Sequence, residues 1–329
     1  MQKRWKQALG AGLLAGFGLT ALAPALAAST NTFPDKPLRV VVPYPPGGST
    51  DTVARLVSEQ MSGLLGQPVV VENRPGASGV VAAEYVLRQP ADGYTLMLVV
   101  SSHALLDKTM ANLSFKPLQD FRGVGTTAYT EFALMGHPGT AAKDLKTAIA
   151  NIKADPKSIN WGMVGINGMG RMAVEQFSEA AGVQLSPVPY QGSAQLLTAV
   201  AAGDVQYALD VVGTFVPHIK SGRTLGLAVS GKERLPEIPD VPTFAEAGLP
   251  EYSFGMWYGL IARAQTPDPI IEKLGSTLAK VMATPAVQER LAALQLQPLA
   301  LSPQQFDARI KADSERFGVL LERAGIKPQ

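Results

Sequence analysis

Short apolar runs alternate with segments of helical periodicity along most of the chain. Residues 38–42, 69–71 and 94–100 form nearly continuous apolar runs, which are typical of strands buried on both faces. Between the first two runs, residues 53–65 place their apolar side chains on one helical face. A further helix is expected at 80–87. The order of strand, helix and strand predicts an α/β fold with mainly parallel sheets flanked by helices.

The same alternation begins again in the middle of the chain. Helices are expected at 142–154, 172–181 and 194–202. Strands are expected at 160–164, 186–188, 205–209 and 225–229. A strand at 257–261 follows, and then three amphipathic helical stretches that are interrupted at Pro285 and Pro303.

The total length agrees with two α/β units. At about 150 residues per domain, 329 residues suffice for two domains, each with its own core. If the last segment packs back on the first unit, the chain forms two lobes, 28–128 plus 258–329 and 129–257. Two crossings between the lobes are then expected, at 126–132 and 254–262.

The N-terminus has the layout of a secretion signal. Lys3, Arg4 and Lys6 precede a short apolar stretch, and an Ala-Leu-Ala cleavage site ends at Ala27. The alternative is a permanent membrane anchor. As a helix, however, the apolar stretch would span about 24 Å, less than the ~30 Å core of a bilayer. We therefore expect 1–27 to be a signal peptide and the mature protein to reach the periplasm.

Composition and charge exclude several kinds of site. The chain has no cysteine, which rules out disulfides, thiol catalysis and cysteine-based metal sites. Its three histidines are far apart, so no metal site and no cofactor is expected. Without the three cations of the leader, the 29 basic residues fall to 26 against 27 acidic ones. Charges of both signs are interspersed, so we expect no nucleic-acid partner.

The first candidate site is the loop 43–51, between a predicted strand and a predicted helix. Its glycines allow backbone N–H groups to approach a ligand, and the start of a helix favours an anion such as a carboxylate. An ordinary tight turn is the alternative. Asp51 could orient the loop or accept a ligand amine, although it would repel a nearby carboxylate. The candidate ligand-binding residues are Tyr44, Pro46, Gly47, Gly48, Ser49 and Asp51.

The second candidate is the glycine-rich turn 162–171, which again leads from a strand to a helix. It does not fit the G-x-G-x-x-G fingerprint, so a dinucleotide site is a weak interpretation. Gly165, Asn167 and Gly168 would line a donor-rich helix start. Arg171 is either a solvated surface cation or a fork for a second carboxylate.

Other polar residues follow predicted strands. Because ligands of open α/β sheets bind beyond the carboxyl ends of strands, we expect one cleft there. Asp210 belongs to this group, although it could equally cap a turn. The other candidates are Ser101, His103, Gln191, Gly192 and Ser193. The chain lacks G-x-S-x-G, Walker A and H-E-x-x-H motifs, and this favours a binding protein over an enzyme.

Several ordered blocks together resemble the substrate-binding receptors of tripartite tricarboxylate transporters, the Bug receptors. The resemblance covers nearly the whole mature chain. Its blocks are Val-Pro-Tyr-Pro-Pro-Gly-Gly at 42–48, Val-Glu-Asn-Arg-Pro-Gly-Ala at 71–77, Pro-Ala-Asp-Gly-Tyr-Thr-Leu at 90–96, Val-Pro-Tyr-Gln-Gly-Ser at 188–193 and Pro-Asp-Val-Pro-Thr-Phe at 239–244.

The resemblance implies a two-lobed, type II-like periplasmic binding protein that closes by hinge motion over a small organic acid. It also implies a monomer that serves a large and a small integral membrane subunit. In the family, backbone amides of the Pro-Pro-Gly-Gly loop meet the ligand carboxylate. The same resemblance supports Gly165 to Arg171, residues 191–193 and Asp210 as the lining of the second lobe.

One departure from the family pattern bears on the ligand. Many members have Gly and His where this chain has Asn167 and Arg171. We therefore hypothesise that the receptor prefers a dianion, with one carboxylate bound by each lobe. A module that presents its ligand to a sensor kinase and, less favoured, a periplasmic hydrolase are the alternative functions.

Overall fold

The computed structural model describes residues 33–328 except 157, 158 and 167. The expected signal peptide and Asn167 therefore lie outside the described residues. Within the described part, none of the helices is both long and apolar enough to cross a membrane.

The first half is built on a parallel core of three strands. The strands are β1 (Leu38–Val42), β2 (Val69–Asn73) and β3 (Thr95–Val100), and β1 pairs in parallel with both of the others. Val40 and Leu96 lie in one hydrophobic cluster, whereas Val41 and Met97 lie in another. Successive residues thus enter cores on opposite faces of the sheet, which explains why these strands are apolar throughout.

Helices cover both faces of this first half. α1 (Ser49–Leu65) buries Val53, Val57 and Met61, which are four residues apart and so share one helical face. It ends at Gly66, whose φ of 69° is the left-handed conformation that favours glycine. The other helices of this half are α2 (Val80–Leu87), α3 (Leu106–Thr109), α4 (Pro117–Asp120), α9 (Asp268–Met282) and α10 (Pro285–Ala293), with short 3₁₀ turns at Ala77–Gly79 and Ser101–Leu105.

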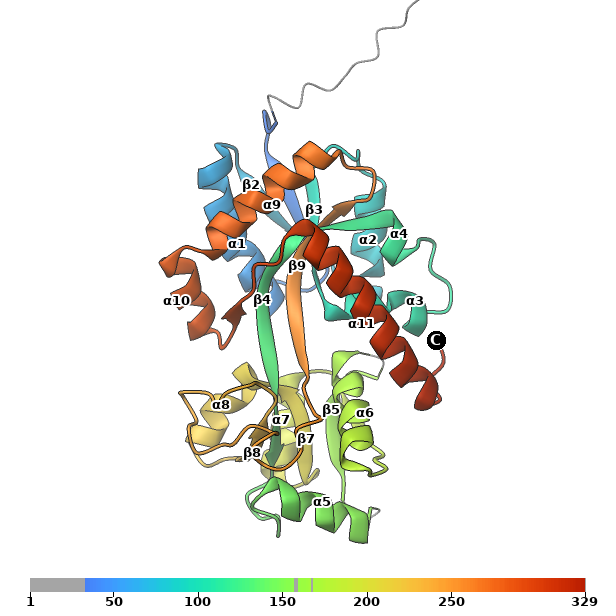
Figure 1. Cartoon of the computed structure of the whole chain (residues 1–329), viewed down its shortest axis with the longest axis vertical. Coiled ribbons are helices and arrows are strands. Elements are labelled where there is room, and N and C mark those ends of the chain that lie inside the picture. Colours follow the sequence, from blue (N-terminus) through green and yellow to red (C-terminus); the bar gives the residue numbers. More distant parts are fainter. Residues whose placement is uncertain (1–32, 157–158, 167, 329) are drawn as a thin grey trace, which may run out of the picture.

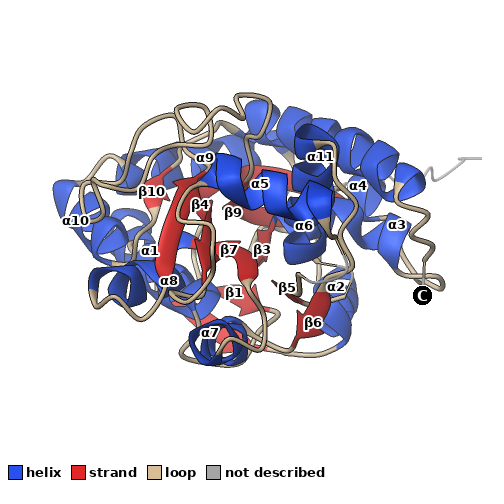
Figure 2. Ribbon diagram, turned by 90° about the horizontal axis from the view of Figure 1, so that it is seen from below, coloured by secondary structure: helices blue, strands red, loops and turns tan. Residues whose placement is uncertain are grey.

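The second half repeats the α/β arrangement. Its strands are β5 (Trp161–Val164), β6 (Val188–Tyr190), β7 (Tyr207–Val211) and β8 (Leu225–Val229). Its helices are α5 (Leu145–Ala154), α6 (Met169–Ala181), α7 (Ser193–Ala202) and α8 (Val212–Lys220). β5 pairs in parallel with β6 and β7, so the carboxyl ends of these three strands lie at the same edge of the sheet. Seen from below, the strands lie in the centre and helices surround them (Figure 2).

Two long strands connect the halves. β4 (Phe121–Gly136) and β9 (Gly255–Arg263) run side by side from the upper to the lower part of the molecule (Figure 1). β4 pairs with β9 along 121–131 and then with β7 and β8 along 132–136. Because one strand belongs to the pairing of both halves, the sheet is continuous, in the order β2-β1-β3-β9-β4-β7-β5-β6. The expected crossings lie within β4 and over most of β9.

The structure corrects the prediction of mainly parallel sheets. The parallel order holds within β1–β3 and β5–β7, but β9 is antiparallel to β3, and β4 is antiparallel to all of its partners, among them β10 (Gln297–Pro298). An apolar run indicates that a strand is buried, but not whether it runs parallel or antiparallel to its neighbours, which explains the error. The sequence pattern also missed α8, which contains Pro217, and most of β4.

The C-terminal helix α11 (Pro303–Arg323) contacts both halves. Phe306 and Ile310 pack in a core cluster of the first half, and Phe317 and Leu321 pack in one of the second. In Figure 1 the helix descends beside β9 toward α6. The division into lobes at 28–128 plus 258–329 and 129–257 stays a prediction, and α11 is a third connection beside β4 and β9.

Candidate functional site

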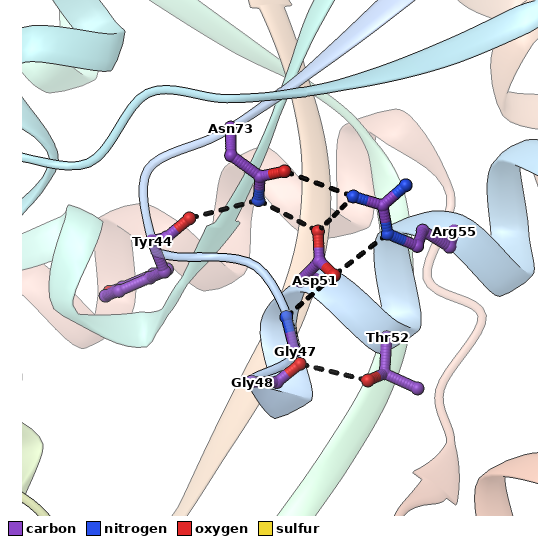
Figure 3. A network of polar contacts seen from close by, with 7 residues as sticks. All are labelled: Tyr44, Gly47, Gly48, Asp51, Thr52, Arg55 and Asn73. Atoms are coloured by element: carbon purple, nitrogen blue, oxygen red, sulfur yellow. Dashed lines mark hydrogen bonds and ion pairs between the residues drawn. The ribbon is translucent and has the colours of Figure 1, made fainter.

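Asp51 holds the loop between β1 and α1 in place (Figure 3). Its carboxylate accepts hydrogen bonds from the Gly47 N–H at 3.0 Å, from Asn73 Nδ2 at 2.8 Å and from the Arg55 guanidinium at 2.9 and 3.0 Å. These bonds, led by those from Arg55, lower the pKa of Asp51 to about 2. Asn73 also donates to the Tyr44 carbonyl at 3.1 Å. Of the roles that the sequence left open for Asp51, the structure shows loop positioning.

Helix α1 begins without a side-chain cap. Gly48 is its N-cap residue, and glycine supplies no capping oxygen. A Cβ atom at either Gly47 or Gly48 would meet nothing within 4 Å, so these glycines border open space. Gly47 also requires glycine for its φ of 89°. Pro46 and Ser49 are exposed on the same turn. The free N–H groups and the helix dipole make this turn suited to an anion.

Two helices of the second half begin in the same way. Gly168 is the N-cap of α6 and Gly192 is the N-cap of α7, and a Cβ atom at either would again meet nothing within 4 Å. The Gly165 N–H donates to the Tyr190 carbonyl at 2.9 Å, which holds the two turns side by side. At Gln191, the N–H is bound by the side chain of Gln195 at 3.3 Å. The predicted glycine turns therefore form one donor-rich edge.

Asp210 lies at the end of β7, beside the start of α7. The residue is 5% exposed. Burial raises the pKa of Asp210 to about 6, opposed by hydrogen bonds from the Ser193 hydroxyl and the Val211 N–H. Its Oδ2 has no hydrogen-bond partner among the described residues. Unlike Asp51, this carboxylate keeps one enclosed oxygen without a hydrogen-bond partner among the described residues.

Tyr258, in β9, links the two halves of the site. Its hydroxyl lies 3.3 Å from Ser49 Oγ, at the start of α1. Burial raises the pKa of Tyr258 to about 12, and the nearby Tyr44 and Asp210 add to the increase. Tyr44 is itself half-buried, and burial raises the pKa of its hydroxyl although the Ser102 side chain opposes the shift. Tyr258 therefore borders the start of α1, and Asp210 of the second half is near enough to influence its pKa.

Ser101 and His103 both make contacts that support the fold. Ser101 Oγ accepts a hydrogen bond from the Trp257 N–H at 2.9 Å and so fixes β9 against β3. His103 packs edge-on against Phe121, and neither ring nitrogen has a well-formed hydrogen bond among the described residues. Burial lowers the pKa of His103 to about 4, although the Pro117 backbone opposes the shift. His103 is therefore neutral at pH 7. It borders a cavity of about 430 Å³ beside α4 and α11.

Arg171 forms an ion pair within α6. Its guanidinium lies 2.5 Å from Glu175 Oε1, and both side chains are largely buried. Its Nε atom has no partner among the described residues. Because Glu175 neutralises the cation, the structure does not show Arg171 as a free fork for a second carboxylate. In the part of the chain that the structure describes, no three acidic or histidine side chains form a group suited to a metal ion.

Comparison with known proteins identifies the family. The family model described as "Tripartite tricarboxylate transporter family receptor" matches residues 53–326. The chain belongs to this family. BugT of Bordetella pertussis is 31% identical over 319 residues, which are 96% of this chain and 98% of that protein. An Agrobacterium vitis protein is 33% identical over 305 residues, 92% of this chain and 88% of its own.

Solved structures confirm the two-lobed periplasmic-binding-protein fold of this receptor. A Rhodopseudomonas palustris protein solved with adipate is 30% identical, with a TM-score of 0.78, and the match covers 90% of this chain and 100% of that one. MatC from the same organism, solved with bound malate, is 30% identical with a TM-score of 0.72. The match covers 88% of this chain and 100% of MatC. The periplasmic binding protein BugD is 29% identical, with a TM-score of 0.74 and coverage of 90% and 100%.

Sequence reasoning did not name Tyr258 and Ser102, which lie beside the candidate site. Tyr258 lies in an apolar strand that reads as core, and only its hydrogen-bond distance to Ser49 reveals its place. Ser102 lies between two residues that were predicted. The alternation of side chains along the segment was the available signal, but the 3₁₀ turn at 101–105 breaks the strand period there.

Proposed function

We propose that the protein is an exported solute-binding receptor that captures one small organic acid between its halves. The receptor then presents the acid to the large and small membrane subunits of a tripartite tricarboxylate-type transporter. After removal of the signal peptide near Ala27, it acts in the periplasm. The proposal rests on membership of the receptor family and on the chemistry of the helix starts.

The observation that carries the proposal is the absence of capping side chains at the starts of α1, α6 and α7. Each N-cap is a glycine in front of open space, at Gly48, Gly168 and Gly192. Packing therefore does not explain the lack of a side chain at these three positions. Uncapped N–H groups bind a carboxylate, and each bond to a charged group contributes about 1.5–3 kcal/mol. The R. palustris relatives were solved with adipate and malate, which are carboxylates.

Hinge closure follows from the positions of these groups. The start of α1 belongs to the first half, whereas those of α6 and α7 belong to the second. A ligand that touches both sets stabilises the conformation in which they are close, and thus shifts the population toward a closed state. β4 and β9 are the strands that would bend, because β4 pairs with strands of both halves and β9 runs beside it. The closed surface would be recognised by the membrane subunits.

A thermal-shift panel of organic acids on the purified chain tests ligand binding. An acid at 100 times its dissociation constant adds about 2.7 kcal/mol of apparent stability. We expect at least one carboxylate to raise the melting temperature and neutral amides of the same acids to have no effect. If no organic acid binds, the proposal is wrong.

Two further measurements separate receptor function from its alternatives. Incubation with candidate esters and amides should give stoichiometric binding without product, whereas turnover would indicate a hydrolase. Deletion of the encoding gene should abolish uptake of the bound acid. If uptake persists and only a transcriptional response to the acid is lost, the protein serves a sensor kinase instead.

A further inference from the structure

The first half contains a cavity of about 430 Å³ that none of the described glycine turns lines. Residues of α4, β4, β9 and α11 surround it, in the region between α4 and the upper part of α11 in Figure 1. Of the candidate site residues that the structure describes, only His103 borders it. Pockets for small molecules measure about 300–1,000 Å³. The cavity is therefore large enough to be a second binding site.

The floor of this cavity is mostly apolar. Phe121, Ile261 and Ile310 line it, and each of them is at most 7% exposed. Leu118 adds an apolar side chain to the wall and is 40% exposed. A water molecule on such a floor finds few hydrogen-bond partners, so an apolar group that displaces it is favoured. The floor thus suits the apolar body of a ligand.

His103 is a polar residue in this lining and is 4% exposed. Burial lowers its pKa to about 4, so the ring is neutral at pH 7 and adds no charge to the cavity. Neither ring nitrogen has a well-formed hydrogen bond among the described residues. The chain therefore does not supply the polar contact that this buried ring needs.

The charged residues of the lining are two cations and one acid, and only one of them lacks a partner. Arg122 Nη1 donates to Asp268 Oδ1 at 2.6 Å. Asp307 Oδ1 accepts a hydrogen bond from the Gly123 N–H, also at 2.6 Å. Lys311 is exposed and has no hydrogen bond or ion pair with any described residue, although Asp307 is four residues before it on α11. The unpaired charge of the cavity is therefore positive.

From this lining we infer that the cavity binds a monocarboxylate with an apolar body, such as a medium-length acyl or an arylalkyl chain. The body packs on the apolar floor, and Lys311 binds the carboxylate at the mouth of the cavity. The site is separate from the glycine turns, so it does not rest on the proposed function. Its ligand would be more apolar than one held by backbone N–H groups at helix starts.

Calorimetry with octanoate, octanamide and octylamine on the full chain at pH 7.5 tests the inference. The three compounds share one apolar chain and differ in the charge of the head group. We expect octanoate to bind at least tenfold more tightly than octylamine, with octanamide between them. Gly48→Asp, which blocks the start of α1, should leave the affinity for octanoate within about twofold of the wild-type value.

Variants at two exposed positions separate the head group from the apolar body. Lys311→Glu reverses the charge at the mouth, and we expect the affinity for octanoate to fall at least fivefold and that for octanamide to change less than twofold. Leu118→Ser removes apolar surface from the wall and should weaken both compounds about threefold.

Lys280→Glu is the matched control for the charge change. Lys280 is exposed in the last turn of α9, at the opposite end of that helix from Asp268. The control should change the affinity for either compound by less than about twofold. A melting curve for each variant verifies that it is folded.

The outcomes either support or overturn the inference. If octanoate binding is lost in Gly48→Asp and kept in Lys311→Glu, octanoate occupies the candidate ligand site and the inference is wrong. Tighter binding of octylamine than of octanoate, equal losses in Lys311→Glu and Lys280→Glu, or no binding of any of the three compounds also overturns it. The proposed function is tested independently by the panel of organic acids.

Discussion

The two halves of the candidate site each contain one buried aspartate, and the two have opposite environments. Asp51 accepts four hydrogen bonds from Gly47, Arg55 and Asn73, and its pKa is lowered to about 2. Asp210 is buried at the end of β7, keeps Oδ2 without a partner among the described residues, and has its pKa raised by burial to about 6.

This difference suggests a division of roles between the halves. In the first half, the hydrogen bonds of Asp51 hold the loop, and the backbone N–H groups at the start of α1 stay free to bind the ligand. In the second half, the buried aspartate holds no such loop, and the free N–H groups are those at the starts of α6 and α7.

The largest expected effect comes from blocking the N–H groups of the first half. Gly48→Asp places a carboxylate at the start of α1, where it caps the free N–H groups and repels a ligand anion. We expect the affinity for the best organic acid to fall about 10- to 150-fold, the equivalent of 1.5–3 kcal/mol. Calorimetry measures the loss.

Gly63→Asp is the matched control for this charge. Gly63 is exposed on the same helix, and a Cβ atom there would meet nothing within 4 Å. The control should change affinity by less than about twofold, since Gly63 is far along the helix from its start. An equal loss in both variants would show that the start of α1 has no special role.

Removing the carboxylate that shapes the loop should cost both stability and affinity. Asp51→Ala leaves the Gly47 N–H, Arg55 and Asn73 without their acceptor. We expect the free energy of unfolding to fall by about 1–3 kcal/mol in urea titrations, and affinity to fall as the loop loosens. Asp144→Ala, which removes the side-chain cap of α5, should cost about 1 kcal/mol without loss of affinity. If Asp51→Ala binds normally, the loop does not depend on Asp51.

The two aspartates should give stability profiles of opposite slope with pH. The folded-state pKa of Asp51 is lowered, so its contribution is present above about pH 4 and is lost as pH falls toward 2. The folded-state pKa of Asp210 is raised, so wild-type stability falls as pH rises from about 4 to 6. Between pH 4 and 6, we expect the free energy of unfolding of Asp210→Asn to rise by on the order of 2 kcal/mol relative to that of the wild type. Urea titrations between pH 4 and 7 measure it, and a constant difference would contradict the raised pKa.

The smallest expected effect concerns Arg171. Its guanidinium is already paired with Glu175 at 2.5 Å, which neutralises its charge. We expect Arg171→Ala to weaken binding of organic acids by less than about threefold in calorimetry. A loss of tenfold or more for dicarboxylates alone would restore the two-carboxylate hypothesis and weaken the contrast between the halves.

Patterns within one segment predicted much of this fold, because burial of a strand or helix leaves a local signal. The strands at 38–42 and 225–229 and the helix at 80–87 have the predicted bounds. β4 was missed over most of its length because it pairs with β9 in one part and with β7 in the other, and a pattern within one segment does not show its pairing partners. α11 likewise reads as one amphipathic helix, although its two ends pack on different halves.

The site could be predicted only where backbone chemistry shapes the sequence. The turns at Gly47, Gly168 and Gly192 could be predicted because each glycine stands between a strand pattern and a helix pattern. The roles of Asp51 and Asp210 could not be separated, since each is an isolated acid in the sequence and only their spatial neighbours differ. The place of Tyr258 could not be predicted either, because it too depends on spatial neighbours.

A crystal structure of the chain with its tightest-binding organic acid tests the central claim most directly. We expect one ligand carboxylate within hydrogen-bond distance of the N–H groups at the start of α1, directly or through one water. The same ligand should also contact the N–H groups at the starts of α6 and α7, with β4 and β9 bent around it. A ligand found only away from these helix starts, for example only in the cavity beside His103, would contradict the account.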